Sequence, residues 1–270
     1  MNKTASPTVY IYDGVDAEWF DTDAVKNYVE QWLPWLNIVI RDDLVGYASA
    51  PLDTLAELFS RLRVRHPSKR VVVNRILKPE LDYETRLLTG RSRATAGVVY
   101  DGVELQRAVY GMMSAEERRL DDVSVWITER AIVTWDENDR RFHARVSVYG
   151  YPSIISTTGM VIAPARERAY YISRRFGIGT EPKTSPADGR YLEFRTQAVT
   201  ECAKGYVMQA IMFALTGEPF CEDSGCRLFN AHWQREMMAA QCGGDSDFCP
   251  RHEHIFDVWK RAGRCTFYDV

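Results

Sequence analysis

The sequence contains no uninterrupted apolar run of about 18 residues, the minimum for a membrane-spanning helix. Its first residues, MNKTASPTVYIYDG, carry one lysine and no apolar segment before a polar break, so they do not have the pattern of a secretion signal. We therefore expect a cytoplasmic protein without membrane contact. Thiols stay reduced in that compartment, so we expect the 6 cysteines to be free, catalytic or metal-bound rather than disulfide-bonded.

An excess of positive charge is also missing. The formal net charge is −3 and the isoelectric point is about 6.0, which gives no general reason to expect nucleic-acid binding. One local exception is RLRVRHPSKR, residues 61–70, with four arginines and a lysine around an expected turn. This segment is either a solvated helix end and loop or a phosphate-binding patch.

Several catalytic motifs are absent. The sequence has no H-E-x-x-H zinc motif, no G-x-x-x-x-G-K-[ST] phosphate loop and no G-x-S-x-G nucleophile elbow. The zinc deaminase pattern requires P-C-x-x-C, and PFCEDSGC has a different cysteine spacing. None of these enzyme classes is therefore predicted from its usual motif.

The composition is that of a folded protein, with 46% hydrophobic and 12% aromatic residues in 270 positions. We expect one domain over residues 1–270. Hydrophobic periodicity predicts strands at 8–13, 37–43, 70–76 and within 122–136 and 141–164, and helices at 21–36, 52–64, 102–117 and 165–176, with a loop at 177–190. This order predicts a mixed α/β (α+β) fold with a partly parallel sheet and flanking helices.

The longest helical pattern covers residues 191–219. Gly217 suits a helix C-cap, and Pro219 prevents the helix from continuing. The stretch 217–254 then holds four of the 6 cysteines and three of the 5 histidines. Within the domain we therefore expect residues 191–258 to form a long helix followed by a metal-binding segment.

Two pairs of potential metal ligands lie in this segment. Cys221 and Cys226 flank a four-residue loop, and Cys249 and His252 form a C-x2-H pair. Two close pairs on short turns can supply the four ligands of a tetrahedral zinc site, and such a closed site stabilises structure rather than performing catalysis. We predict one structural zinc per chain.

Other interpretations of the cysteines stay open. The four ligands could instead be free core thiols beside a surface histidine, or two of the cysteines could form a disulfide. Cys242 could replace one ligand, although it has no second ligand at the C-x2 spacing. Cys202, on a helical face, and Cys265, near the end of the sequence, are expected to be buried or inert thiols.

These motifs resemble those of the archaemetzincin family of zinc metallopeptidases. In that family a helix with H-E-x-x-H-x-x-G-x-x-H is followed directly by Cys-x4-Cys-x-Met, and a later C-x-x-C completes a second zinc site. Here AIMFALTGEPFC ends in Cys221, Gly217 occupies the position of the motif glycine, and Leu228 stands at the Met position. A shift of a few residues places Cys249 and His252 at the last pair.

The resemblance implies a metzincin-like fold and the second zinc site. The stretches TWDENDRRFHARVSVYGYPSIISTTG and AKGYVMQAIMFALTGEPFCEDSGCRLFNAHW also resemble a little-characterised family named for an expected metallopeptidase activity. The catalytic residues differ, however. Ala210, Ala214 and Phe220 occupy the zinc-binding histidine positions, and Ile211 occupies the position of the general base. None of these side chains can bind zinc or move a proton, so the resemblance does not imply the metzincin reaction.

Three functional hypotheses follow. The chain could be a pseudo-enzyme that holds a peptide or protein along an edge strand near residues 153–161. It could be an active metal-dependent hydrolase with another ligand set. The first candidates are then His232 and Glu236, at i, i+4 on an expected helix, and His143 or His254 could complete a second metal site. It could also be a zinc-stabilised interaction module whose basic residues 61–70 contact an anionic partner.

Overall fold

The structure is a computed structural model that describes residues 7–71, 73–168, 170–171, 191–244 and 246–265. The contacts between its residues divide the chain into two compact units. Unit 1 consists of Met1–Val9, Ala17–Val39 and Met160–Val270, and unit 2 of Tyr10–Asp16 and Ile40–Gly159. The two units are groups of contacting residues and do not test whether each folds independently. One domain over residues 1–270 therefore stays a prediction.

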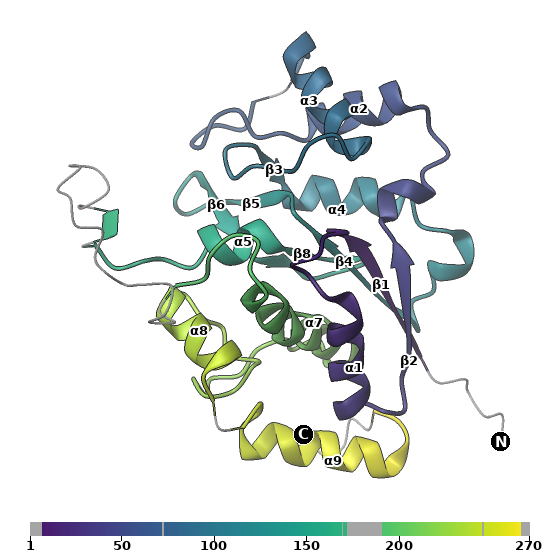
Figure 1. Ribbon diagram of the computed structural model, residues 1–270, viewed down its shortest axis with the longest axis vertical. Coiled ribbons are helices and arrows are strands. Elements are labelled where there is room, and N and C mark those ends of the chain that lie inside the picture. Colours follow the sequence, from purple (N-terminus) through teal and green to yellow (C-terminus); the bar gives the residue numbers. More distant parts are fainter. Residues whose placement is uncertain (1–6, 72, 169, 172–190, 245, 266–270) are drawn as a thin grey trace. The chain divides into compact units, whose positions relative to one another are not determined.

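Unit 1 is built mainly from helices. They are α1 (Thr22–Trp32), α7 (Ala198–Thr216), α8 (Gln234–Cys242) and α9 (Pro250–Ala262). Helix α1 begins where the Asp21 side chain accepts a hydrogen bond from the Ala24 backbone N–H, and it buries Val25 and Val29. Helix α7 packs against both α1 and α8 (Figure 1).

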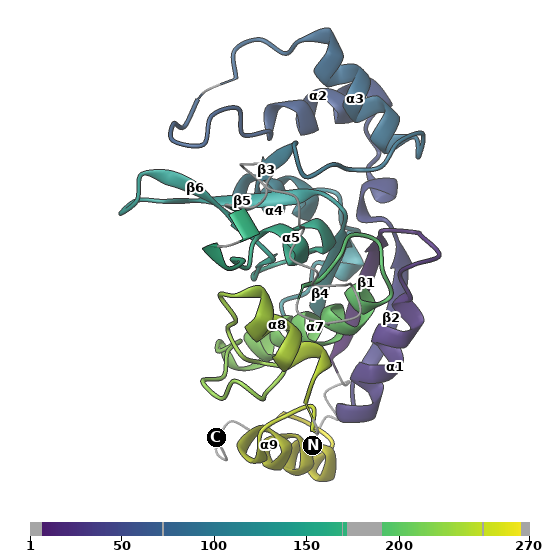
Figure 2. The same cartoon turned by 60° about the vertical axis from the view of Figure 1, so that its left-hand side comes forward.

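Strands β1 (Thr8–Gly14) and β2 (Asn37–Asp42) begin in unit 1 and continue into unit 2, and helix α5 (Thr157–Ile162) runs from unit 2 into unit 1. The remaining elements of unit 2 are the 3-10 helices η1 (Leu44–Tyr47) and η2 (Ala115–Glu117), the helices α2 (Leu52–Arg61), α3 (Lys78–Leu88) and α4 (Gly102–Tyr110), and the strands β3 (Val99–Asp101), β4 (Val123–Thr128), β5 (Ala131–Asp136), β6 (Arg141–Arg145), β7 (Ser147–Val148) and β8 (Ser153–Ser156). Helices α2 and α3 pack against each other as a pair (Figure 2).

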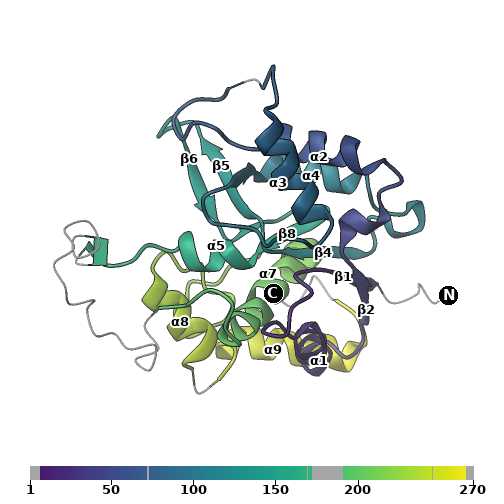
Figure 3. The ribbon, with the colours of Figure 1, turned by 45° about the horizontal axis from the view of Figure 1, so that its top comes forward.

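The strands form two mixed sheets. One has the order β2-β1-β4-β8-β7, and the other has the order β3-β5-β6. Strand β4 runs parallel to β8, with Val125 opposite Ser153, whereas β7 and β8 are antiparallel. In the smaller sheet β3 and β5 are parallel, and β5 and β6 form the antiparallel pair seen in Figure 3. The predicted mixed α/β fold with a partly parallel sheet is confirmed.

The hypothesis of a peptide bound along an edge strand near residues 153–161 is wrong. Strand β8 is paired on both sides, by β4 and β7, and all its residues are buried. From Thr157 onward the chain is helical. A further strand cannot add to a strand whose backbone groups are already paired on both sides.

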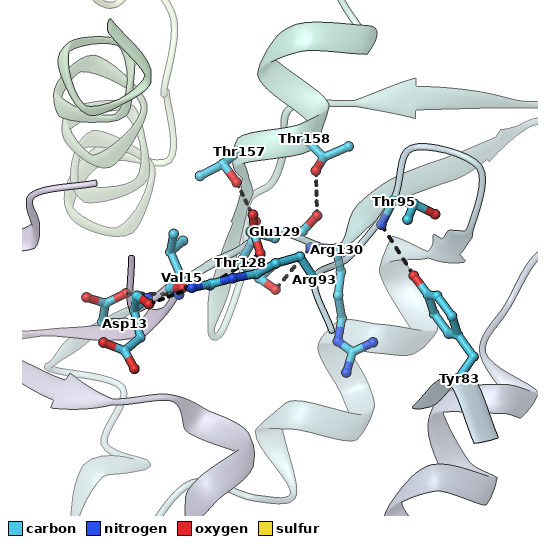
Figure 4. A network of polar contacts seen from close by, with 11 residues as sticks. Asp13, Val15, Tyr83, Arg93, Thr95, Thr128, Glu129, Arg130, Thr157 and Thr158 are labelled. Carbon is cyan, nitrogen blue, oxygen red and sulfur yellow. Dashed lines mark hydrogen bonds and ion pairs between the residues drawn. The ribbon is translucent and has the colours of Figure 1, made fainter. Parts of the chain in front are cut away.

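A polar network in unit 2 explains why helix α5 starts at this point (Figure 4). The hydroxyl groups of Thr157 and Thr158 donate hydrogen bonds to the backbone carbonyls of Thr128 and Glu129, at 3.3 and 2.6 Å. Ser156 donates in the same way to the carbonyl of Arg130, at 2.7 Å. These bonds stabilise the start of α5 against the end of β4, at the carboxyl ends of the two parallel strands.

Three predicted elements differ from the structure. No strand lies in the described part of residues 70–76, where Val71 is 52% exposed, because an apolar run without a pairing partner does not form a sheet. Residues 157–162 are helical rather than extended, and helix α7 begins at Ala198 rather than at 191. The helix predicted for 165–176 lies largely outside the described residues, and the loop at 177–190 does so entirely.

Across the described ranges, every helix is too short or too polar to cross a membrane.

Candidate metal centre

The first ligand pair lies in a closed loop directly after helix α7. The helix ends at Gly217, whose φ of 82° is the left-handed conformation that glycine adopts without strain. The Cys221 N–H then bonds to the carbonyl of Leu228 at 2.9 Å, and the Phe229 N–H bonds to the carbonyl of Cys226 at 2.9 Å. These backbone bonds fold residues 221–229 back on themselves and bring both thiols to one side of the loop.

The second pair lies at the start of helix α9. Cys249 is the N-cap residue, Pro250 follows at the first helical position, and His252 lies within the first turn. Residues three apart in this position face the same side, so the Cys249 Sγ and His252 Nδ1 atoms are 3.2 Å apart.

The two pairs meet in unit 1. The Sγ atoms of Cys221 and Cys249 lie 3.8 Å apart, and the Cys226 Sγ atom lies 3.7 Å from His252 Nδ1. The four ligand atoms all lie within 4.8 Å of one another. Tetrahedral zinc with Zn–S bonds of about 2.3 Å and a Zn–N bond of about 2.05 Å separates its ligands by about 3.8 Å (S to S) and 3.6 Å (S to N). The separations of 3.8 and 3.7 Å match these values, and the 3.2 Å between Cys249 Sγ and His252 Nδ1 is shorter, so the group has about the size of a zinc site.

Burial changes the pKa values of three of these side chains. Burial raises the pKa of the Cys226 thiol to about 12, and it raises the pKa of Cys221 as well. Burial lowers the pKa of His252, and the charge of Arg251 adds to this, so the imidazole is neutral near pH 7 and can bind a cation. Thiols that burial keeps neutral become thiolates when a divalent cation supplies the compensating charge, and binding then releases their protons.

Neighbouring polar groups position the first loop. The Asp223 N–H donates to Cys221 Sγ at 3.3 Å. Arg227 bonds through Nε to Asp247 at 2.6 Å, and its backbone N–H bonds to the carbonyl of Asp247, which holds the loop beside Cys249. The buried amides of Gln209 and Gln241, on α7 and α8, both donate to the carbonyl of Arg227. The sequence analysis missed these residues, although a glutamine on the apolar face of α7 is a signal that could have drawn attention.

Aromatic packing connects the second pair to the rest of unit 1. Phe248, next to Cys249, contacts Trp32 of α1 and Phe256 of α9 with ring centroids 4.7 and 4.8 Å apart. Trp259 of α9 lies edge-on to Trp35 at 6.5 Å. The four-ligand group therefore joins the loop after α7 to a helix that packs on α1.

The other cysteines lie apart from this group. The Sγ atoms of Cys202 and Cys242 are 3.8 Å from each other, and neither belongs to the four-ligand group. Cys242 therefore does not replace one of the predicted ligands. All the cysteines are free thiols, which excludes the disulfide interpretation for the residues that the structure describes.

The positions of the metzincin catalytic residues form no site. Ala210 and Ile211 are completely buried in α7, whereas Ala214 is exposed and Phe220, after the helix, is 45% exposed. Leu228, at the methionine position, is completely buried. Apolar side chains at these positions offer no ligand and no base.

The predicted pair His232 and Glu236 does not share a helical face. Helix α8 begins at Gln234, so His232 precedes its N-cap, Trp233. The Glu236 carboxylate accepts the backbone N–H groups of His232 and Trp233, both at 3.1 Å, and thereby caps the helix. The position of the Glu236 carboxylate is therefore explained by helix capping.

His143 and His254, the other candidate metal ligands, join no metal group in the described ranges. His143 lies on β6 in unit 2, with Nε2 at 2.8 Å from the Asp139 carboxylate. His254 lies on the exposed side of α9. A cluster of three or more potential ligands is found only at Cys221, Cys226, Cys249 and His252 within the part of the chain that the structure describes.

The chain is similar to known proteins in sequence and in structure. A family model described as "Probable metallopeptidase family (DUF6775)" matches residues 5–259. Among solved structures, archaemetzincin from Methanopyrus kandleri is similar with a TM-score of 0.46 and 10% sequence identity, over 96% of this chain and 98% of that chain. A search of curated proteins gave no match.

Proposed function

Because the chain belongs to this probable metallopeptidase family, we propose that it is a metallopeptidase-like protein with one structural zinc and without the metzincin peptidase reaction. The observation that supports the proposal is the group of Cys221, Cys226, Cys249 and His252, whose spacing fits tetrahedral zinc. Because the protein supplies all four ligands of a tetrahedral zinc ion, no coordination position is open for water or substrate. Its role is then to hold the loop after α7 and helix α9 together.

The absence of the reaction rests on the residues of helix α7 and of the segment that follows it. A metzincin site needs histidine ligands and a carboxylate base, and this chain has Ala210, Ile211, Ala214 and Phe220 at those positions. The protein is then a pseudo-enzyme that keeps a structural site. A peptide or protein as its partner and a cytoplasmic location stay predictions.

We expect the zinc-loaded protein to hydrolyse no peptide in a mixture of quenched fluorescent peptides. The physical reason is that neither an open metal position nor a base is available on α7. The alternative, a hydrolase that uses His232 and Glu236, predicts cleavage that disappears in His232→Ala. Cleavage by the wild type that this substitution abolishes would contradict the pseudo-enzyme and support the alternative. Cleavage that a co-purifying peptidase causes would persist in the variant.

A further inference from the structure

A cavity lined by basic residues lies in unit 2, and the extended segment after helix α2 forms part of its wall. The Val64 N–H bonds to the carbonyl of Val99, and the Asp101 N–H bonds to the carbonyl of Leu62, both at 2.9 Å. Arg63 thus lies opposite Tyr100 of β3. Because side chains alternate along an extended segment, Arg63 and Arg65 point to the same side.

The extended segment borders a cavity of about 550 Å³, a volume typical of small-molecule sites. Its walls come from the extended segment, the turn that follows it, the start of α4, and strands β5 and β6. The basic residues that line it are Arg61, Arg63, Arg65, Lys69, Arg70 and Arg107. Asp101 and Glu104 are the acidic residues of the lining, and Asp101 caps α4 by accepting the N–H groups of Val103 and Glu104.

Four of these cations are already paired with carboxylates. The pairs are Arg61–Glu57 at 2.6 Å, Arg65–Glu80 at 2.7 Å, Arg70–Glu137 at 3.2 Å and Arg107–Glu104 at 2.6 Å. Arg63 and Lys69 form no ion pair with any residue that the structure describes. Two positive charges beside the cavity are therefore left without a direct carboxylate partner.

Arg63 has a further unmet requirement. Its guanidinium lies over the ring of Tyr83, with 5.2 Å from Cζ to the ring centroid, which fixes its position. Its Nη1 atom is shielded from solvent and has no hydrogen-bond partner among the described residues. A buried donor without an acceptor costs about 1–3 kcal/mol.

The cavity also has an aromatic wall. Trp135 and Phe142 line it, with ring centroids 5.1 Å apart, and Arg70 lies over Trp135. The two rings are inclined at 72° and give the same cavity an apolar wall beside its basic residues. A ligand that uses both features has an anionic group and an apolar or aromatic body.

We propose that this cavity binds a small phosphate ester. The phosphate group contacts Arg63 and Lys69, and the organic part lies against Trp135 and Phe142. A phosphate monoester carries a charge of about −1.5 to −2 near pH 7, which matches two unpaired cations better than a single carboxylate does. Guanidinium groups bind phosphate oxygens through paired N–H donors, which adds direction to the charge attraction. This binding site is independent of the zinc group in unit 1.

The test is isothermal titration of the full-length, zinc-loaded protein with phenyl phosphate and, separately, with inorganic phosphate. We expect saturable binding of phenyl phosphate and weaker binding of inorganic phosphate, which lacks the organic part. Arg63→Ala and Lys69→Gln should each weaken phenyl phosphate binding by about tenfold or more, because each removes a charged hydrogen-bond donor. Arg91→Ala is the matched control, since it removes an exposed arginine outside the cavity.

Lys69 is exposed, so Lys69→Gln is expected to fold normally and keeps the test valid if Arg63→Ala does not fold. The absence of saturable phenyl phosphate binding to the wild type would overturn the proposal. Equal affinities of the wild type and Lys69→Gln would also overturn it. Equal binding of inorganic phosphate and phenyl phosphate would overturn the assignment of an ester and leave free phosphate as the ligand.

Discussion

Replacing Cys226 with serine is expected to remove the zinc ion and to unfold the segment that contains helix α9. Cys226 is completely buried, and it belongs to the ligand pair in the loop after α7. Structural zinc in small peptides contributes about 10–16 kcal/mol of apparent folding free energy, whereas whole domains are stable by only about 5–15 kcal/mol. The loss of one ligand therefore removes a large share of the stability of unit 1.

The measurement is zinc content per chain combined with thermal unfolding of wild type and variant. Cys265→Ser is the matched control, because Cys265 is a free thiol that belongs to no ligand group in the described ranges. We expect the control to keep its zinc and its melting temperature. A Cys226→Ser protein that retains the zinc of the wild type, with an unchanged melting temperature, would show that the four residues do not hold a structural ion.

Replacing Glu84 with leucine is expected to destabilise unit 2 by about 3–5 kcal/mol. Glu84 is completely buried, and its carboxylate lies 2.9 Å from Nη1 of Arg130, whose side chain is 8% exposed. Tyr100 donates its hydroxyl proton to Glu84 at 2.7 Å and accepts a bond from Arg130 at 2.8 Å. The substitution leaves the Arg130 guanidinium buried without its counter-charge.

Urea unfolding measured by circular dichroism gives the change in the free energy of unfolding. Asp121→Ala is the control, because Asp121 pairs with Arg119 at the surface and such pairs contribute at most about 1 kcal/mol. The double variant Glu84→Leu, Arg130→Met should recover most of the loss, since it removes both buried charges together. A loss in Glu84→Leu no larger than in Asp121→Ala would mean that the buried pair does not stabilise the unit.

The residues of the candidate metal group could be predicted from the sequence because each pair is local. Cys221 and Cys226 share one turn, and Cys249 and His252 share the first turn of a helix, so spacing alone indicates each pair. The short chain between the two pairs indicates that they can meet at one site. The structure brings the four together and adds supports such as Arg227 and Asp247, which no spacing rule indicates.

Features that depend on distant parts of the chain could not be predicted. Residues 70–76 have the composition of a strand, yet the structure gives their described residues no pairing partner. The position of β8 between β4 and β7 depends on sheet order, which overturned the edge-strand hypothesis. The basic residues 61–70 were recognised in the sequence, but the cavity exists only because residues 62–64 pair with β3 and lie beside β5 and β6. The buried pair of Glu84 and Arg130 likewise joins residues 46 positions apart.

The most direct measurement for the central proposal is the elemental metal content of the untagged protein, purified without added metal or chelator. One zinc per chain is expected, held by Cys221, Cys226, Cys249 and His252. Two tightly bound metal ions per chain would contradict the proposal, because a second site would restore the possibility of catalysis. The absence of zinc in folded protein would contradict it equally, since the four side chains would then be stable together without an ion.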